Sequence, residues 1–516
     1  MQLKSKKLQK IIFILLLAIL PVLNIVNRFP DNKFSGDTAS LLLPALSPLN
    51  NNGVPYLDYW EYKPPGIMLV VSSWASIFGQ SLGSFKFLHL LLNFLISLLL
   101  YKITTKILSR EYSLLSTVII SIILFSPLIE SLLIGSEMFG LLLSLLGLKL
   151  LIQDKPSLFW SGFAFATASQ MKDPFGFTVF AIIPFMLFAF QQAKYKTVII
   201  QTLKFVMGFI SSLAVITAYL LSSSALPSYL EVLRYKSGFL NIRQLIIHTP
   251  ETITIISKLI TELNYAPAII LLLSFGALIS LIKLTFINRV NLPQLVVIFY
   301  SIGSFIGFAA GRSISSHYLV QIIPPLILTI AIITDWASSL TTSVLKGRFS
   351  KFVVSTLFLL TFIIVVLPNQ KLALAYIPTQ FPTSIVWQVK LKPEEEFILE
   401  NTTSSDCIVS VYGWGAAEAP VHTQRRTCTR HFLANITLAK WQRLEYYTQV
   451  INNPPQIVIY NTFLTDMDVP QFEKTVFNWS KVLDNCYQQS SDIPKIFVLQ
   501  NMNSMDATQC LIANSR

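Results

Sequence analysis

Charged residues are scarce in this chain. They make up 13% of its 516 residues, whereas 53% of the residues are hydrophobic and 37 are Phe. Soluble domains are usually about a quarter charged. A soluble fold of this length would leave too much apolar surface in water, so a soluble globular protein is excluded. The composition instead indicates a protein whose surface is largely solvated by lipid.

Cysteine is absent from the first 391 residues. The only four cysteines follow in the tail, at Cys407, Cys428, Cys486 and Cys510. This distribution suggests an oxidising compartment and two disulfides. Three pairings are open, among them Cys407–Cys428 with Cys486–Cys510. Four reduced, buried thiols are the alternative.

Several enzyme motifs are also missing. The chain has no HExxH, no pair of CxxC motifs, no Walker loop and no GxGxxG that opens a helix. Metalloprotease, zinc, nucleotide-hydrolase and dinucleotide functions therefore lack support. The net charge of +13 does not indicate nucleic-acid binding, because Lys and Arg form short clusters between apolar runs. That pattern is typical of cytoplasmic loops that meet anionic lipid headgroups.

About eleven apolar runs approach the ~20 residues that cross a bilayer. The first is interpreted as a retained span because no small-residue cleavage site follows it. With a cytoplasmic N-terminus, alternation places 17 Lys and Arg residues in short cytoplasmic loops. The positive-inside rule therefore puts the tail outside. The spans are expected at 11–26, 85–107, 112–128, 137–152, 157–171, 174–191, 197–221, 266–284, 292–310, 318–335 and 352–368.

The tail differs from the rest in charge and pattern. Residues 1–391 have a net charge of +16 and residues 392–516 one of −3. Apolar runs in the tail predict strands at 407–412, 456–460 and 496–499 and a helix at 438–451. We therefore expect a polytopic α-helical membrane protein with a transmembrane domain at 1–370 and an extracytoplasmic C-terminal α/β domain at 371–516. The expected location is a bacterial plasma membrane.

The first outer loop, 29–84, carries the strongest chemical signal. It contains Asp37, Asp58, Glu61 and Lys63 within 27 residues, in a segment where Pro and Gly fix the backbone. Ionisable groups packed at a membrane surface are costly and so tend to be functional. Asp37 is a candidate general base or cation ligand, and Lys63 is placed to meet an anion. The alternative is an ordinary solvated loop.

The loop sequence, Gly36-Asp-Thr-Ala followed by Gly53-Val-Pro-Tyr-Leu-Asp-Tyr-Trp-Glu-Tyr-Lys-Pro-Pro-Gly66, resembles the first-loop signature of the GT-C membrane glycosyltransferases. The branch it resembles is family 39, which includes protein O-mannosyltransferases and bacterial lipid A aminoarabinose transferases. Three more stretches match in order over about residues 30–335: Gly135-Ser-Glu137, Lys172-Asp173-Pro174 and the Gly311–Pro325 segment with Arg312 and His317.

The resemblance implies a role for each matched residue. Asp37 maps to the catalytic base, Lys63 to the lysine that binds the donor phosphate, and Glu137 to a second acid that orients the acceptor or a cation. Lys172, Arg312 and His317 are candidates for phosphate binding by their charge and position; the alternatives are that Lys172 and Arg312 snorkel to outer headgroups and that His317 is a packing residue. Tyr56, Asp58 and Glu61 are candidates for loop organisation or acceptor binding.

Two departures prevent the acceptor from being carried over. Thr38 follows Asp37 where the protein mannosyltransferases have Glu, and Tyr62 separates Glu61 from Lys63 where the aminoarabinose enzymes join Glu to Lys. The expected function is thus an inverting glycosyltransferase with a polyprenyl-phosphate-linked sugar donor and a lipid, glycan or protein acceptor. Membrane lipids are expected partners and nucleic acid is not. No metal site is assigned, although a divalent cation stays open.

A transporter or flippase for a lipid-linked sugar is the alternative from another class. Such proteins usually show repeated halves and charges at mid-membrane. The chain has no repeat, and its chemistry-bearing residues fall at one face of the expected bundle. A second open question is the basic patch of Arg425, Arg426 and Arg430 in the tail, which is either an acceptor-binding surface or a solvated face.

Overall fold

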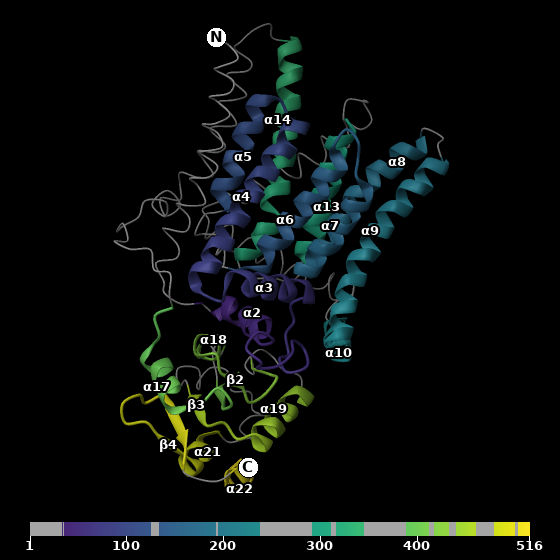
Figure 1. Ribbon diagram of the computed structural model, residues 1–516. Helices are drawn as coiled ribbons and strands as arrows, with labels where there is room; N and C mark the ends of the chain where they lie inside the picture. Colours follow the sequence, from purple (N-terminus) through teal and green to yellow (C-terminus); the bar gives the residue numbers. More distant parts are fainter. Residues whose placement is uncertain are drawn as a thin grey trace, which may run out of the picture.

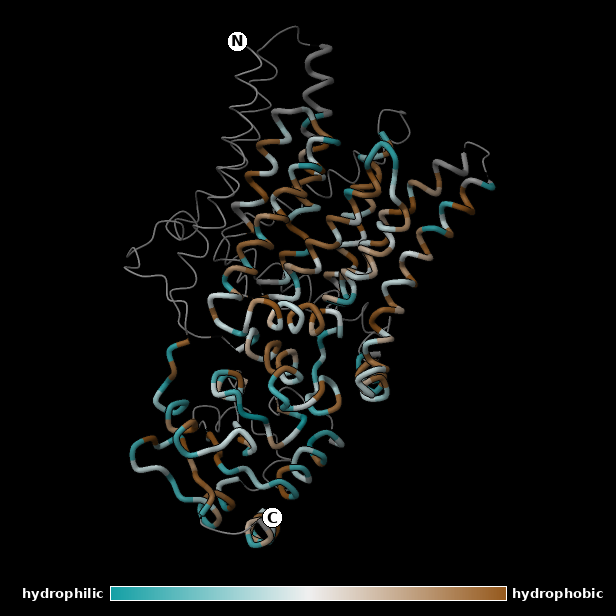
Figure 2. The backbone as a smooth tube through the Cα atoms, viewed as in Figure 1, coloured by the Kyte–Doolittle hydropathy of each residue, from teal (hydrophilic) through white to brown (hydrophobic). Residues whose placement is uncertain are grey.

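The structure is a computed structural model. It describes residues 34, 36–124, 134–191, 195–237, 291–310, 316–344, 389–411, 417–432, 440–460, 479–500 and 504–515. A bundle of helices occupies one end of the molecule and a smaller α/β unit the other (Figure 1). Hydrophobic residues dominate the bundle, whereas the α/β unit alternates between polar and apolar segments (Figure 2).

The bundle helices coincide with the predicted spans wherever the structure describes them. Among the described residues, two helices are long and apolar enough to cross a membrane, Leu82–Ile107 and Val198–Ser222, and five shorter apolar helices accompany them. The spans expected at 11–26, 266–284 and 352–368 lie outside the described residues. The helices are α4 (Leu82–Ile107), α5 (Arg110–Leu124), α6 (Ser136–Ile152), α7 (Leu158–Met171), α8 (Ile183–Gln191), α9 (Tyr195–Ser222), α13 (Leu292–Ala310) and α14 (Ile323–Val344).

Two predicted spans begin as tighter helices. The 3-10 helix η2 (Asp173–Ile182) precedes α8, and η3 (Ser316–Gln321) precedes α14. Prolines at positions 324 and 325 lie in the first turn of α14, where the missing amide hydrogens do no harm. The backbone of η2 packs directly on two glycines of α13. A Cβ on Gly303 or Gly307 would lie 2.1 Å from a carbonyl oxygen of η2.

The same device joins α7 to α9. A Cβ on Gly162 would lie 2.1 Å from the Phe205 carbonyl oxygen, and one on Gly208 would lie 1.9 Å from that of Phe159. Small residues at helix interfaces let backbones approach closely, which is the usual way to gain van der Waals contact in a lipid environment. Each helix therefore needs its glycine where it crosses the other.

The first outer loop holds two helices, α2 (Gly36–Leu46) and α3 (Pro65–Phe78), at the end of the bundle that faces the α/β unit (Figure 1). Pro65 starts α3, because its fixed φ suits a first helical position. Gly79 ends it with φ of +83°, a conformation that favours glycine. A further helix, α10 (Leu226–Ser237), follows α9.

The α/β unit contains a five-stranded sheet with the strand order β2-β1-β3-β5-β4. β1 pairs in parallel with β2 and β3, and β5 pairs antiparallel with β3 and β4. The predicted strands and helix of the tail are confirmed as β1, β3, β5 and α19. The elements are α17 (Pro393–Asn401), β1 (Cys407–Val411), α18 (Glu418–Thr423), β2 (Arg426–Thr427), α19 (Lys440–Asn452), β3 (Ile457–Tyr460), α21 (Trp479–Cys486), β4 (Tyr487–Gln489), β5 (Ile496–Leu499) and α22 (Ser504–Asn514).

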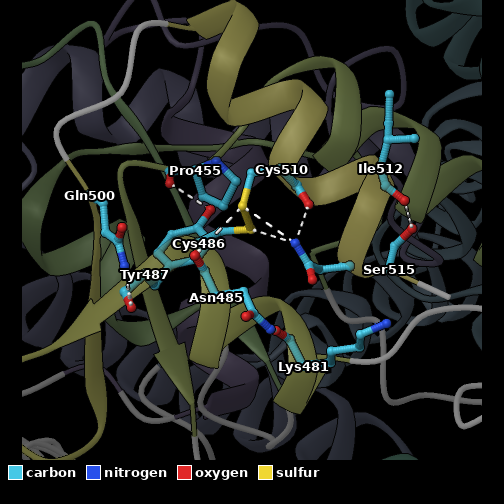
Figure 3. The surroundings of a disulfide bond; sticks show 10 residues. Pro455, Lys481, Asn485, Cys486, Tyr487, Gln500, Cys510, Ile512 and Ser515 are labelled. Atoms are coloured by element: carbon cyan, nitrogen blue, oxygen red, sulfur yellow. Dashed lines mark hydrogen bonds between the residues drawn. A yellow bond between two sulfur atoms is a disulfide. The ribbon is translucent and has the colours of Figure 1, made fainter.

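Two disulfides brace this unit. Cys407–Cys428 ties β1 to the residue that follows β2, and Cys486–Cys510 ties α21 to α22 (Figure 3). Of the three pairings that the sequence leaves open, the structure has this one. Cross-links of this kind are typical of chains that fold in an oxidising compartment.

Candidate functional site

Asp37 and Lys63 lie together, although 26 positions separate them in the sequence. Asp37 is in the first turn of α2. The Ser40 hydroxyl donates a hydrogen bond to the Asp37 carbonyl oxygen at 2.9 Å, and the Lys63 ammonium donates one to the Ser40 hydroxyl at 3.2 Å. One serine side chain therefore links the backbone of the candidate base to the candidate phosphate-binding cation.

Glu61 fixes the approach of Lys63 to this helix. Its side chain is buried, and one carboxylate oxygen accepts hydrogen bonds from the amides of Tyr62 at 2.8 Å and Lys63 at 3.1 Å. The other oxygen lies 3.5 Å from the Lys63 ammonium. A buried carboxylate needs such partners, because burying an unpaired charge is costly. Glu61 thus holds both the backbone and the side chain of Lys63.

A strained turn supports the loop from its other side. Tyr56 has φ of +68°, an uncommon value for a bulky residue, and its hydroxyl donates a 2.6 Å hydrogen bond to the Lys63 carbonyl oxygen. Asp58 closes the turn by accepting from the Val54 amide at 2.7 Å. Gly53 is required there, because a Cβ would lie 2.7 Å from the Asp58 Cβ.

Glu137 and Lys172 form a second charged cluster. Glu137 is in the first turn of α6 and Lys172 follows the last residue of α7; the two side chains form an ion pair at 2.7 Å. Lys172 also donates to the Tyr318 hydroxyl at 3.3 Å. Burial lowers the pKa of Lys172, but Glu137 and Tyr318 outweigh it, so that the pKa is raised and the ammonium persists. Next to it, Asp173 pairs with Lys236 at 2.7 Å.

The two clusters adjoin through the contact of α3 with α7. A Cβ on Gly66 would lie 2.7 Å from both the Cβ and the carbonyl oxygen of Gln170, so the backbones touch. Gly66 follows Lys63 by three residues, and Gln170 precedes Lys172 by two. Burial raises the pKa of Tyr56, and the charges of Tyr229, Glu61 and Asp173 raise it further. The Tyr56 hydroxyl therefore stays protonated and donates.

Two expected site residues fall where the structure does not describe the side chain. Arg312 lies outside the described residues, and so does the side chain of His317. Among the residues that the structure describes, no group of three His, Cys, Asp or Glu side chains is arranged to hold a metal ion. The described cluster is thus one of carboxylates and ammonium groups at one end of an apolar bundle. Such a cluster can bind an anion and accept a proton.

The C-terminal unit contributes contacts that sequence reasoning missed. His422 accepts a hydrogen bond from the Phe34 amide at its Nε2, at 3.1 Å, so its Nδ1 carries the hydrogen donated to Glu395 at 2.8 Å. Phe34 is three residues before Asp37. Farther along the loop, the Trp60 amide donates to the Arg430 carbonyl oxygen at 2.7 Å. No local pattern predicts these pairs, since almost 400 residues separate their members.

The apolar bundle, the two helices of the first outer loop and the α/β unit packed on them are arranged as in solved structures of membrane glycosyltransferases with the GT-C fold. This confirms the fold that the first-loop motif predicts. No protein-family model matches the chain, and no curated protein matches it in sequence. The fold assignment therefore rests on similarity to solved structures.

Three solved structures illustrate the similarity. The first is the Archaeoglobus fulgidus oligosaccharyltransferase AglB in complex with an inhibitory peptide and a dolichol-phosphate, with TM-score 0.52 and 11% identity over 96% of this chain and 75% of that chain. An oligosaccharyltransferase from the same organism, in complex with Zn and sulfate, has TM-score 0.51 and 13% identity over 86% and 67%. ArnT from Cupriavidus metallidurans, in the apo state, has TM-score 0.50 and 12% identity over 96% and 98%.

Proposed function

We propose that this protein is an inverting membrane glycosyltransferase that moves a sugar from a polyprenyl phosphate to a lipid, glycan or protein hydroxyl on the extracytoplasmic side. The observation that carries the proposal is the Lys63–Ser40–Asp37 arrangement, in which Ser40 links the Lys63 ammonium to the backbone of Asp37 at the end of the bundle. A dolichol-phosphate is present in one structure of AglB, and it supports a lipid phosphate as the leaving group here.

The reaction that we propose needs opposite charges on two sides of the sugar. The acceptor hydroxyl oxygen attacks the anomeric carbon while the bond from that carbon to the phosphate oxygen breaks. Asp37 takes the hydroxyl proton, and the electron pair of the broken bond stays on the phosphate. Lys63 stabilises that negative charge. Preorganised groups of this kind are usually the largest electrostatic contribution to catalysis, and holding the hydroxyl against the anomeric carbon adds proximity.

The Glu137–Lys172 pair is proposed as the second part of the site. Lys172, with Arg312 and His317, would add positive charge toward the phosphate, while Glu137 would orient the acceptor or a cation. The ion pair itself supports a structural contribution, because each side chain already neutralises the other at 2.7 Å. On this proposal the Lys172 ammonium keeps its ion pair with Glu137 and also interacts with the donor phosphate once the donor binds.

The outward orientation is supported by where charge and disulfides fall. Asp37 and Lys63 are at the end of the bundle that contacts the disulfide-braced unit (Figure 1). Lys106 and Lys149 are in the last turns of α4 and α6, at the opposite end. Basic clusters mark the cytoplasmic side of membrane proteins. The transporter alternative is not favoured, since the chain shares its fold with two glycosyltransferases.

The proposal is tested by transfer from a panel of radiolabelled polyprenyl-phosphate sugars in membranes that contain the full chain. Asp37→Asn should lower transfer by about 100-fold or more, since general-base catalysis typically contributes about 10²–10⁴-fold, while the amount of folded protein stays normal. The matched control is Asp154→Asn, which changes an exposed carboxylate at the opposite end of the bundle. Wild-type turnover in the Asp37 variant would defeat the base assignment.

Lys63→Ala tests the phosphate role separately. Because Lys63 is proposed to contact the donor phosphate, its loss should raise the KM for the donor more than the KM for the acceptor. Lys155→Ala, an exposed lysine beside Asp154, is the control and should change neither constant. A larger effect on the acceptor KM would count against the phosphate role of Lys63.

A further inference from the structure

An open cavity of about 410 Å³ lies between the first outer loop and the C-terminal unit. One wall is residues 51–53 and 57–59 of the loop, and the other is residues 426–430 with Gln449 and Asn453. The volume is within the range of about 300–1,000 Å³ that is usual for small-molecule sites. The two walls come from segments almost 400 residues apart, so the cavity exists because the two parts dock.

The lining is polar and carries opposite charges on its two walls. Asp58 and Asn51 are exposed on the loop side, and Arg426 is exposed on the side of the C-terminal unit. Arg430 also lines the cavity, but its guanidinium is paired with Glu445 at 2.7 Å. Within the described part of the chain Arg426 has no ion-pair partner. The side-chain amides of Asn52, Gln449 and Asn453 already donate within the protein. The exposed side chains left for a ligand are therefore one cation, one anion and the Asn51 amide.

The opposite charges on the two walls favour a neutral ligand over an ionic one. An ionic ligand would meet attraction from one wall and repulsion from the other. A neutral ligand with many hydroxyl groups can both donate to carboxylate and amide oxygens and accept from guanidinium and amide hydrogens. Carbohydrates have this chemistry, and hydrogen bonds to the charged groups would be stronger than those between neutral groups.

The cavity and the Asp37 site share one turn of the first outer loop. Asp58 lines the cavity, and two residues earlier Tyr56 holds the Lys63 carbonyl oxygen at 2.6 Å. The turn between them is fixed by the Val54–Asp58 hydrogen bond and by Gly53. A ligand held in the cavity is thus positioned by the same rigid turn that positions Lys63.

We propose that this cavity binds a neutral, hydroxyl-rich glycan portion of the acceptor, with Arg426 and Asp58 as its hydrogen-bonding residues. The proposal rests on the proposed glycosyltransferase function and makes it narrower, because it requires an acceptor that carries a glycan. The cavity is a binding subsite and takes no part in bond breaking.

Binding is tested with the full chain in detergent against immobilised short oligosaccharides, one set neutral and one set anionic. The wild-type protein should retain neutral oligosaccharides, and Arg426→Ala should weaken that binding about 10-fold, the loss expected for a hydrogen bond to a charged group. Arg426→Gln keeps hydrogen-bond donors without the charge, so it should bind closer to wild type than Arg426→Ala does. Lys495→Ala, an exposed cation elsewhere on the unit, is the matched control and should bind normally.

The outcomes separate this proposal from the proposed function. Asp37→Asn should bind oligosaccharide like wild type while it fails in transfer, and Arg426→Ala should raise the acceptor KM without changing the donor KM. The subsite is refuted if neutral oligosaccharides do not bind, if Arg426→Ala binds them normally, or if only anionic ones bind and both Arg426 variants lose them equally. The protein could instead bind neutral oligosaccharides in an Arg426-dependent way and transfer no sugar from any donor. That outcome would refute the glycosyltransferase function and leave a carbohydrate-binding site.

Discussion

Breaking the Glu137–Lys172 ion pair is the sharpest perturbation of the charged cluster. The side chains are 5% and 16% exposed and lie 2.7 Å apart. Removing one member of a buried pair leaves an uncompensated charge, which costs about 3–5 kcal/mol. Lys172 keeps some access to water, so we expect Lys172→Met to destabilise the protein by about 3 kcal/mol and Glu137→Gln by somewhat less, because the amide still accepts a hydrogen bond.

The double variant Glu137→Gln/Lys172→Met separates pairing from loss of packing. Replacing both members of a buried pair often costs little, so the double variant should melt at a higher temperature than Lys172→Met alone. Thermal unfolding of the full chain in detergent, followed by tryptophan fluorescence, measures this order. The control is Lys106→Met, which breaks the exposed Lys106–Asp154 pair at the opposite end and should leave the melting temperature unchanged.

A double-mutant cycle gives the decisive number. If the effects of the two substitutions on melting temperature are additive, the two side chains are not coupled, and the reasoning from their burial is wrong. A melting temperature of Lys172→Met equal to that of wild type would refute it as well. If the double variant is stable and still transfers sugar at the wild-type rate, the pair is structural and its proposed role toward the donor fails.

Two further predictions concern contacts with the C-terminal unit. His422→Ala removes the acceptor of the Phe34 amide and leaves Glu395, 1% exposed, without its imidazole partner; it should lower the melting temperature and transfer together, whereas His422→Gln should restore part of both. Acid should also destabilise a second pair of the C-terminal unit, His431 and Glu445, which are hydrogen-bonded at 3.0 Å. Burial lowers the pKa of His431. Burial raises the pKa of Glu445, but hydrogen bonds, including one from His431, outweigh this effect and lower that pKa to about 2. In both cases the unfolded chain binds more protons, below about pH 6.5 for His431 and between about pH 4.5 and 2 for Glu445, so stability falls as the pH falls through each window. A melting temperature that rises on acidification from pH 7 to 5 would contradict this sign, and His431→Gln should flatten the upper window.

Local patterns were enough to predict the described bundle helices and the main strands, and they single out the first loop as the candidate site. Apolar runs near the length of a membrane span identify α4 and α9 without any tertiary information, and β-branched runs identify β1 and β3. Asp37 and Lys63 stand out because their chemistry falls in one short, rigid segment. The sequence does not predict that Ser40 links the two residues. Pro44 and Pro64 are usually read as helix breakers, so they hide the pattern of the two helices, α2 and α3, that bring Asp37 and Lys63 together.

Pairings between distant segments were beyond the sequence for a physical reason. Arg425, Arg426 and Arg430 look alike as a basic patch, but each has different surroundings. Arg425 donates to the Thr402 hydroxyl at 2.9 Å, Arg430 pairs with Glu445, and Arg426 faces the cavity. Neighbouring side chains on an extended chain point to opposite sides. Arg425 and Arg426 therefore have different surroundings once β2 pairs with β1. The sequence shows that three arginines are close together, but it does not show which group each side chain contacts.

The C-terminal unit contacts the first outer loop at two places, at Phe34 and at Trp60. Trp60 packs against the ring of Tyr235 and lies under the Arg430 guanidinium, 5.1 Å away. Phe34 is fixed by His422 at the start of the segment that leads into α2. A loop with a strained residue such as Tyr56 keeps its conformation only where its surroundings over-determine it. The geometry of Asp37 and Lys63 therefore depends on the docking of a unit more than 350 residues later in the chain, and a membrane bundle without that unit would present the same residues without holding them in place.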